Sequence, residues 1–227
     1  MRIFFTTIVF LFLSFNTYSQ ELSQVTFSGG TRLTSIAFLA DREVLIRISE
    51  EGKILEWGIE WQAMRSDYYA PKLQPYIGRV EFYGPEADSV NRGKVKSIGT
   101  CMFTYYGPFE MDIKVGKLKS IGRVFLDYYT NYDNVNLKGK LKYIGDRQLE
   151  YYPSYENEAY RGKLKAIGSS FITYYSSFDD KLIRGKVKSI ASVKFLWYTS
   201  LDRLGYGGGL KSGLYRQHIS GITYIVQ

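Results

Sequence analysis

The feature that most constrains this chain is an internal repeat with a period of 23 residues. Each copy opens with glycine, lysine, valine or leucine, and a second lysine, and the copies begin at Gly93, Gly116, Gly139, Gly162 and Gly185. Evenly spaced copies are typical of repeat architectures, in which each unit packs mainly on its neighbours. Below, repeat positions are counted from this opening glycine.

Each copy reads as a β-hairpin. Isoleucine occupies the sixth position, and the first four copies have glycine at the seventh, which suits a two-residue type I′ or II′ turn because glycine tolerates positive φ. Ala191 replaces this glycine in the last copy, where we expect a different turn. A β-prone stretch then ends in an aromatic pair, which is Tyr105-Tyr106, Tyr128-Tyr129, Tyr151-Tyr152, Tyr174-Tyr175 or Trp197-Tyr198.

A polar stretch follows each aromatic pair and contains an aromatic or leucine residue before an acidic one. These dipeptides are Phe109-Glu110, Tyr132-Asp133, Tyr155-Glu156, Phe178-Asp179 and Leu201-Asp202. We interpret the stretch as the long connection to the next hairpin. A degenerate copy precedes the array, because Ile77-Gly78, Phe82-Tyr83 and Arg92 repeat the pattern with a shorter spacing.

The repeats predict an all-β fold, an elongated twisted antiparallel meander of tandem 23-residue β-hairpin repeats rather than a compact sandwich. On a regular register, the lysine stems lie against Phe103 and its equivalents and against the first aromatic residue of each pair. The valine or leucine at position three then lies on the other face, with the second tyrosine and with Asp127, Glu150 and Thr173. Neither face is uniformly apolar, so we expect both to be exposed to solvent.

The segments outside the repeats define the domain boundaries. Residues 1–19 combine Arg2 with the apolar run Ile3 to Phe15 and predict a cleavable secretory signal, because the run is too short to span a bilayer. Residues 20–71 are expected to form an N-terminal β-hairpin and capping segment, 72–204 the hairpin repeats, and 205–227 a glycine-rich loop and closing strand. We expect an exported protein, in the periplasm or at the cell surface, that is not an integral membrane protein.

The charge balance indicates acidic partners. The formal net charge is +8 and the sequence pI is about 9.3, which favours attraction to anionic surfaces. For an exported protein, an acidic protein surface, an acidic glycan or anionic lipid ranks above nucleic acid, and we predict no nucleic-acid partner.

The sequence offers little for catalysis. The one histidine, His218, lies far in sequence from the one cysteine, Cys101, whereas metal sites need clustered ligands. Asp127 and Glu150 occupy the same position in adjacent copies, about 9.6 Å apart at two strand spacings, near the separation in inverting glycosidases. Repeat lysines lie within reach, so we favour cross-strand ion pairs. We predict no catalytic, cofactor-binding or metal-binding residue.

The aromatic ladder and its lysines form the predicted interaction surface. Its residues are Tyr105, Tyr128, Tyr151, Tyr174, Trp197, Lys117, Lys140 and Lys163. Neighbouring rings would make a platform for sugar rings or for a partner protein, whereas the structural alternative, which we favour, is that the rings stiffen the sheet.

The pattern Gly-Lys-Leu/Val-Lys-x-Ile-Gly with a Tyr-Tyr strand, over residues 72–204, resembles uncharacterised exported tandem-repeat proteins of Gram-negative bacteria. As a small exported repeat protein, the chain also resembles the plug subunit of the type 9 secretion translocon. The resemblance implies a non-enzymatic envelope protein that docks on a larger protein, as an accessory or plug subunit of an outer-membrane secretion complex. The alternative is a glycan-binding module that uses the tyrosine ladder.

Overall fold

The computed structural model describes residues 21–40, 43–60, 72–202 and 206–227. Within these ranges the chain is all-β, and its helical content is one short 3-10 segment, η1 (Val135–Leu137). The signal peptide predicted over residues 1–19 lies outside the described residues. The described part contains no helix that is both long and apolar enough to cross a bilayer.

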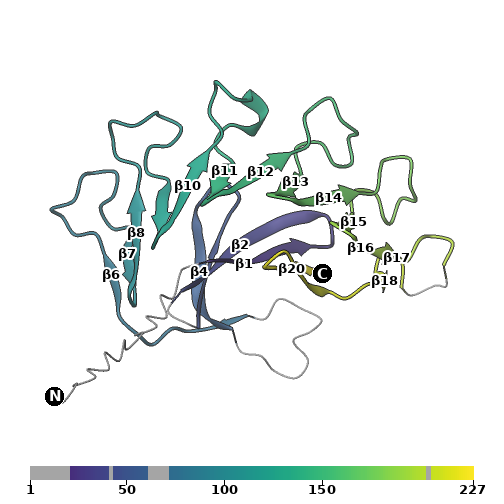
Figure 1. Cartoon of the computed structure of the whole chain (residues 1–227), viewed down its shortest axis with the longest axis horizontal. Coiled ribbons are helices and arrows are strands. Elements are labelled where there is room, and N and C mark those ends of the chain that lie inside the picture. The colour runs from purple at the N-terminus through teal and green to yellow at the C-terminus, as the bar shows by residue number, and fades with distance from the viewer. Residues whose placement is uncertain (1–20, 41–42, 61–71, 203–205) are drawn as a thin grey trace, which may run out of the picture.

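The repeats form an eleven-stranded antiparallel meander, as the sequence predicts. Its strands follow one another in chain order from β6 to β16 and curve into an arc (Figure 1). The strands are β6 (Val80–Phe82), β7 (Val95–Ile98), β8 (Cys101–Tyr105), β9 (Leu118–Ile121), β10 (Val124–Tyr128), β11 (Leu141–Ile144), β12 (Arg147–Tyr151), β13 (Leu164–Ile167), β14 (Ser170–Tyr174), β15 (Val187–Ile190) and β16 (Val193–Lys194).

The segments before and after the repeats combine into a second sheet of seven strands, in the order β19-β20-β1-β2-β3-β4-β5. The closing strand β20 pairs in parallel with β1, and β3 and β4 form a hairpin within the segment 20–71 for which an N-terminal hairpin was predicted. The bounds are β1 (Glu21–Ser28), β2 (Arg32–Ala40), β3 (Val44–Ile48), β4 (Ile54–Glu60), β5 (Leu73–Gln74), β19 (Arg216–Ile219) and β20 (Ile222–Val226).

The two sheets share one hydrophobic core. Phe27, Ile36 and Phe38 from the seven-stranded sheet are fully buried in the same cluster as Phe103 and Leu149 from the meander. In Figure 1, β1 and β2 lie inside the arc of the repeats. The expectation that both faces of the meander are exposed was therefore wrong, because the terminal segments supply a covering sheet.

A β-bulge in every full repeat explains why the predicted faces were also wrong. Tyr105 pairs with Leu118 and Thr104 pairs with Ser120, so Lys119 is an extra residue between them. An extra residue reverses the inward and outward alternation. The valine or leucine at position three, such as Leu118, is consequently buried on the same face as the isoleucine at position six, such as Ile121.

The hairpin turns share one conformation. Gly99 has a φ of 57°, and Ala191 adopts nearly the same value, 48°. We expected a different turn in the last copy, but its conformation is the same, although alanine is strained in the left-handed region. The second residue of these turns does not have a positive φ, which is the pattern of a type II′ turn.

The described part of the predicted glycine-rich loop begins a sixth copy of the hairpin. Gly208 N donates to Tyr198 O and Tyr198 N donates to Gly209 O, which repeats the bonding of the earlier copies. Strands β17 (Leu196–Trp197) and β18 (Leu210–Ser212) then form a small sheet beside the meander. The structure also contains the degenerate first copy. Tyr83 N donates to Lys94 O, as Tyr106 N donates to Lys117 O in the following copy.

Candidate interaction surfaces

The first aromatic residues of the pairs, predicted as a surface, lie inside the molecule. Tyr128, Tyr151, Tyr174 and Trp197 are 0–6% exposed, and Tyr105 is half-buried. Most donate a hydrogen bond to the carbonyl of position three in their own copy, as Tyr128 Oη does to Leu118 O at 2.8 Å. The prediction of an open aromatic platform is corrected, because these rings form part of the core between the sheets.

The second tyrosines join each repeat to the next. Tyr106 Oη donates to Leu126 O at 2.8 Å, and the same bond is made by Tyr83, Tyr129, Tyr152 and Tyr175. Four of these residues also make an edge-to-face contact with the first tyrosine of the next pair, with ring centroids 5.9–6.2 Å apart. They are Tyr83, Tyr106, Tyr129 and Tyr152. Such contacts stabilise neighbouring aromatic residues, so the ladder has a structural role.

The predicted lysines cover the first aromatic rings. The ammonium groups of Lys117, Lys140 and Lys163 lie 4.7–5.2 Å from the ring centroids of Tyr128, Tyr151 and Tyr174. Each also donates to the carbonyl of the glycine that opens the next copy, at 2.7–2.9 Å. The lysines therefore cover these rings as predicted, but the ammonium group itself lies over the ring and is bonded to the protein, whereas it was expected to remain in water.

Burial changes the acid–base properties of two of these lysines. The pKa of Lys163 is lowered to about 8, because partial burial disfavours the charged ammonium. The pKa of Lys117 is lowered for the same reason, while nearby Glu51 acts in the opposite direction. A lysine with a lowered pKa is a common feature of functional sites.

Both carboxylates predicted to pair with repeat lysines form ion pairs, but only Glu150 pairs with a repeat lysine, whereas the partner of Asp127 is a lysine of the preceding loop. Asp127 lies 2.5 Å from Lys114 Nζ, and Glu150 lies 3.5 Å from Lys165 Nζ. Cys101 is fully buried. Among the described residues, no group of three or more histidine, cysteine or acidic side chains is placed to hold a metal ion.

The structure brings out a surface that the sequence interpretation treated only as connections. The long loops of successive repeats lie along the outer rim of the arc (Figure 1). Each loop carries one large apolar residue that is 86–101% exposed, and these are Phe109, Tyr132, Tyr155, Phe178 and Leu201. We call this set the rim residues. Their 23-residue spacing was the signal that could have identified them.

The loops are ordered by internal hydrogen bonds. Asp133 Oδ2 accepts bonds from Thr130 N and Oγ1, both at 2.9 Å, and Asp179 and Asp202 repeat this arrangement. The hydrogen bond from Lys142 and those from Thr130 hold the pKa of Asp133 at about 2. In these three loops, the aspartate of the dipeptide therefore shapes the loop that presents the rim residue.

Neighbouring loops are also connected to each other. Asn157 Nδ2 donates to Ser177 Oγ at 2.9 Å, and Asn136 Nδ2 donates to Ser154 Oγ at 3.1 Å. Binding residues lie disproportionately on loops that a rigid scaffold positions, and here a large exposed apolar side chain recurs on five successive loops. The rim is therefore a candidate interaction surface.

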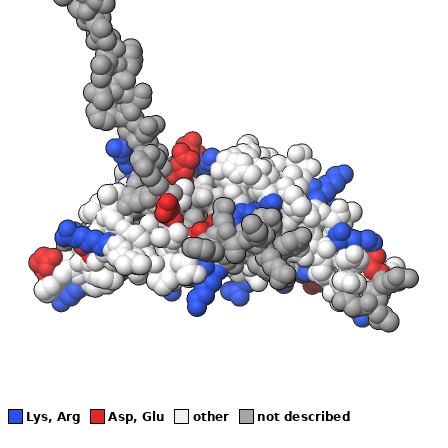
Figure 2. Space-filling model, turned by 90° about the horizontal axis from the view of Figure 1, so that it is seen from below, with Lys and Arg blue, Asp and Glu red and all other residues white. Residues whose placement is uncertain are grey.

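Basic side chains do not form one large patch on the face seen in Figure 2. Among the described residues of that face, lysines and arginines lie in separate small groups, some of them next to acidic residues. A protein that binds the phosphate backbone of a nucleic acid typically carries a continuous basic surface. The charge on this face is therefore dispersed rather than gathered into one basic surface.

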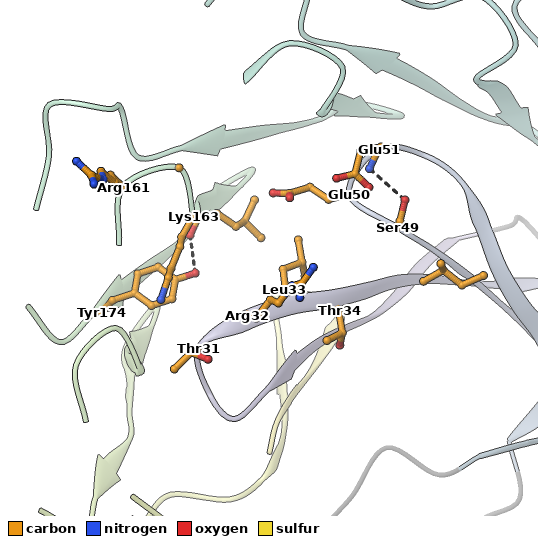
Figure 3. A pocket seen from close by; sticks show the side chains of 13 residues that line it. Thr31, Arg32, Leu33, Thr34, Ser49, Glu50, Glu51, Arg161, Lys163 and Tyr174 are labelled. Carbon is orange, nitrogen blue, oxygen red and sulfur yellow. Dashed lines mark hydrogen bonds between the residues drawn. The ribbon is translucent and has the colours of Figure 1, made fainter. Parts of the chain in front are cut away.

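A cleft of about 560 Å³ lies where turns of the seven-stranded sheet approach the meander. In Figure 3, Glu50 points into it from the β3–β4 turn, and Lys163 and Tyr174 line the opposite wall. Burial raises the pKa of Glu50, although its 3.0 Å ion pair with Lys140 opposes this. The cleft therefore places charged groups of both signs at a junction between the sheets.

A second cleft, of about 520 Å³, lies on the other side of the β3–β4 turn. Lys94, Val95 and Tyr105 line it, with Trp57 from β4 and Lys117. The burial of Lys94 lowers its pKa. Lys94, Val95 and Tyr105 occupy the same repeat positions as Lys163, Leu164 and Tyr174 of the first cleft, so the two clefts have an equivalent wall.

Comparison with known proteins finds no match to a family model, to a curated protein or to a solved structure.

Proposed function

We propose that this chain is a non-enzymatic, exported interaction protein of the cell envelope that docks on a larger protein through its rim residues. The observation that supports the proposal is the row of five fully exposed apolar side chains, one on each of five successive repeat loops. The resemblance to exported repeat proteins suggests that the partner belongs to an outer-membrane secretion complex, in which the chain is an accessory or plug subunit.

The rim has the composition of a protein-binding surface. Aromatic residues are enriched among the residues that contribute most of the energy of protein interfaces. Where the loops leave the sheet, successive copies are about 9.6 Å apart, since each copy adds two strands. Phe109, Tyr132, Tyr155 and Phe178 would enter separate apolar pockets on a partner, while the bonded loops limit the entropy lost on binding.

The charges beside the rim argue against a lipid surface as the partner. Each rim residue is followed by an aspartate or glutamate, as in Tyr132-Asp133 and Phe178-Asp179. Anionic headgroups attract basic segments and repel carboxylates. A protein surface with apolar pockets and basic residues around them fits this pattern better.

The glycan-binding alternative loses its original basis. Tyr128, Tyr151 and Tyr174 are buried, so sugar rings cannot stack on them. Exposed rings remain at the rim, but each is on a separate loop rather than in a continuous platform. Envelope polysaccharide is therefore included as a second ligand in the test.

The test compares capture of envelope proteins by three forms of the tagged chain. Native envelopes are solubilised in mild detergent, and co-eluting proteins are quantified by mass spectrometry. The rim variant changes all five rim residues to serine. The control variant carries Met102→Ser, Phe125→Ser and Phe171→Ser, which are exposed apolar residues on the outer face of the same repeats.

We expect the unmodified chain and the control to retain one large envelope protein at constant stoichiometry. The rim variant should capture at least about 10-fold less of that protein, because a few interface residues, with aromatic residues enriched among them, each contribute about 2 kcal/mol or more. Equal capture by the rim variant would refute the proposal. Retention of polysaccharide instead of a protein would favour the glycan alternative.

A further inference from the structure

The repeats carry a recurring site that the chain itself partly fills. The site consists of the lysine at position two, the backbone N–H of position three and the aromatic ring at position thirteen. In the copy that begins at Gly185, Lys186 Nζ donates to Gly29 O at 2.6 Å and Val187 N donates to Gly30 O at 2.7 Å. Both acceptors belong to the β1–β2 turn. We call this arrangement the glycine-turn site.

The ring of the site selects glycine. Gly30 has a φ of +65°, and a Cβ added to it would lie 2.3 Å from a ring carbon of Trp197. A side chain is therefore excluded both by the ring and by the backbone conformation, which glycine alone adopts without strain. The site recognises two consecutive carbonyl groups and a glycine with positive φ.

An unrelated turn occupies the same site in another copy. Lys117 Nζ donates to Glu51 O at 2.9 Å. The next residue, Gly52, has a φ of +78° and lies so close to Tyr128 that a Cβ would be 2.0 Å from Oη. In both copies the lysine binds the carbonyl before a glycine with positive φ, and that glycine lies against the aromatic ring. Because two turns of different sequence share these contacts, the repeat rather than the turn determines what binds.

The same β3–β4 turn also fills the following copy. Leu141 N donates to Glu50 O at 2.9 Å, and Lys140 Nζ lies 3.0 Å from the Glu50 carboxylate. The chain's own turns thus supply acceptors in the copies that begin at Gly116, Gly139 and Gly185. In the copies that begin at Gly93 and Gly162, the lysine, the position-three residue and the first tyrosine all line a cleft, and Lys117 of the filled Gly116 copy lies beside the second one.

The lysines of these two clefts have fewer partners than Lys117 and Lys140. The structure gives Lys94 Nζ one hydrogen bond, to Gly116 O at 2.6 Å, and Lys163 Nζ one, to Gly185 O at 2.7 Å. An ammonium group has three donors. Lys117 and Lys140, by contrast, each gain a second acceptor from the β3–β4 turn.

We propose that the two clefts bind glycine-containing turns of a partner protein, in the way that the filled sites bind the chain's own turns. The carbonyl before the glycine would accept from Lys94 or Lys163, and the glycine would lie against Tyr105 or Tyr174. Volumes of about 520 and 560 Å³ are within the range of specific binding pockets. The inference rests on the proposed function in taking a protein as the ligand, but it uses none of the rim residues.

The probe for this inference is a cyclic peptide with the sequence of residues 49–53, Ser-Glu-Glu-Gly-Lys, which is the chain's own bound turn. Fluorescently labelled peptide is titrated against the full mature chain and followed by anisotropy. Two further peptides replace the glycine with L-alanine or with D-alanine. We expect the L-alanine peptide to bind at least 10-fold more weakly and the D-alanine peptide to bind better than it, because D-residues favour positive φ.

Protein variants locate the binding. Lys94→Met with Lys163→Met keeps the apolar stems and removes both ammonium groups together with their bonds to Gly116 O and Gly185 O. We expect loss of peptide binding at temperatures where thermal unfolding shows that the variant is still folded. The matched control is Lys96→Met with Lys165→Met, at position four of the same copies, which should bind normally. Equal binding of the glycine and L-alanine peptides, or full binding by the Lys94 and Lys163 double variant, would overturn the inference.

The two proposals can fail separately. Peptide binding does not require the rim, so glycine-dependent binding that persists in the rim variant supports the turn sites. Envelope capture that depends on the rim, combined with no glycine-dependent binding, would leave docking in place and eliminate the turn sites.

Discussion

Two buried tyrosines at the same repeat position provide a direct test of how the ladder stabilises the fold. Tyr128 Oη donates to Leu118 O at 2.8 Å, whereas Tyr151 Oη is buried without a hydrogen-bond partner among the described residues. Both rings make equivalent edge-to-face contacts, at 6.2 and 5.9 Å. Tyr128→Phe and Tyr151→Phe therefore remove a hydroxyl group and keep the ring.

The expected losses differ because only one hydroxyl group is bonded. Tyr128→Phe leaves the buried Leu118 carbonyl without its partner, which costs about 1–3 kcal/mol. Tyr151→Phe removes a hydroxyl group that is desolvated without compensation, so the free energy of unfolding should stay within about 0.5 kcal/mol or increase. For a chain of this length, each kcal/mol corresponds to roughly 2–4 °C in Tm.

Urea unfolding followed by tryptophan fluorescence and by circular dichroism measures both variants, and coincident transitions are required for a two-state treatment. The Tyr128 variant should have a lower midpoint at an unchanged slope. Equal losses for the two variants, or a larger loss for Tyr151→Phe, would refute the assignment of the hydrogen bond as the stabilising contact.

Three further predictions follow from particular contacts. Gly52→Ala should lower the free energy of unfolding by about 2 kcal/mol or more, because the added Cβ would meet Tyr128. Gly162→Ala, where φ is similar but a Cβ would have no atom within 4 Å, should cost about 1 kcal/mol. Equal losses of the two variants in thermal melts would contradict this prediction. The pKa of Lys163 is lowered to about 8, so the folded chain releases this proton at a lower pH than the unfolded chain does. The free energy of unfolding should therefore rise with pH between about 8 and the unfolded pKa near 10.4. The part of this rise that is due to Lys163 should be absent in Lys163→Met when unfolding is measured across that range. The pKa of Asp133, about 2, predicts that its loop keeps its bonds until the pH falls below about 4 and loses them toward pH 2, which NMR of the Thr130 amide would follow; an Asp133 titration near pH 4 would contradict it.

The sequence predicts the meander well because its signals are local. Each hairpin needs only its own turn glycine and β-prone residues, and the 23-residue period repeats that information. The positions of Gly99 and Tyr105 therefore sufficed to place a turn and a strand end.

The buried face could not be predicted because of the bulge. The lysine at position four, such as Lys119, has no feature that distinguishes it from a regularly paired residue. One extra residue exchanges the faces of the strand, which moves Leu118 from the face predicted to carry the second tyrosines to the buried face that carries Ile121.

The covering sheet and the clefts depend on contacts between distant segments. Phe27 and Val226 are buried together only because β1 pairs with β20, and no local pattern encodes a partner almost two hundred residues away. The glycine-turn sites have the same origin, since Gly30 and Gly52 come from outside the repeats.

The parallel pairing of β1 with β20 has a consequence for when the protein can fold. The repeats can form hairpins as they appear, but the core remains open on one side until β20 is available to complete the seven-stranded sheet. Contacts of such high sequence separation form slowly, because a long loop must close first. The chain is therefore expected to stay loosely folded until nearly all of it has been released, which would be compatible with the export that we propose.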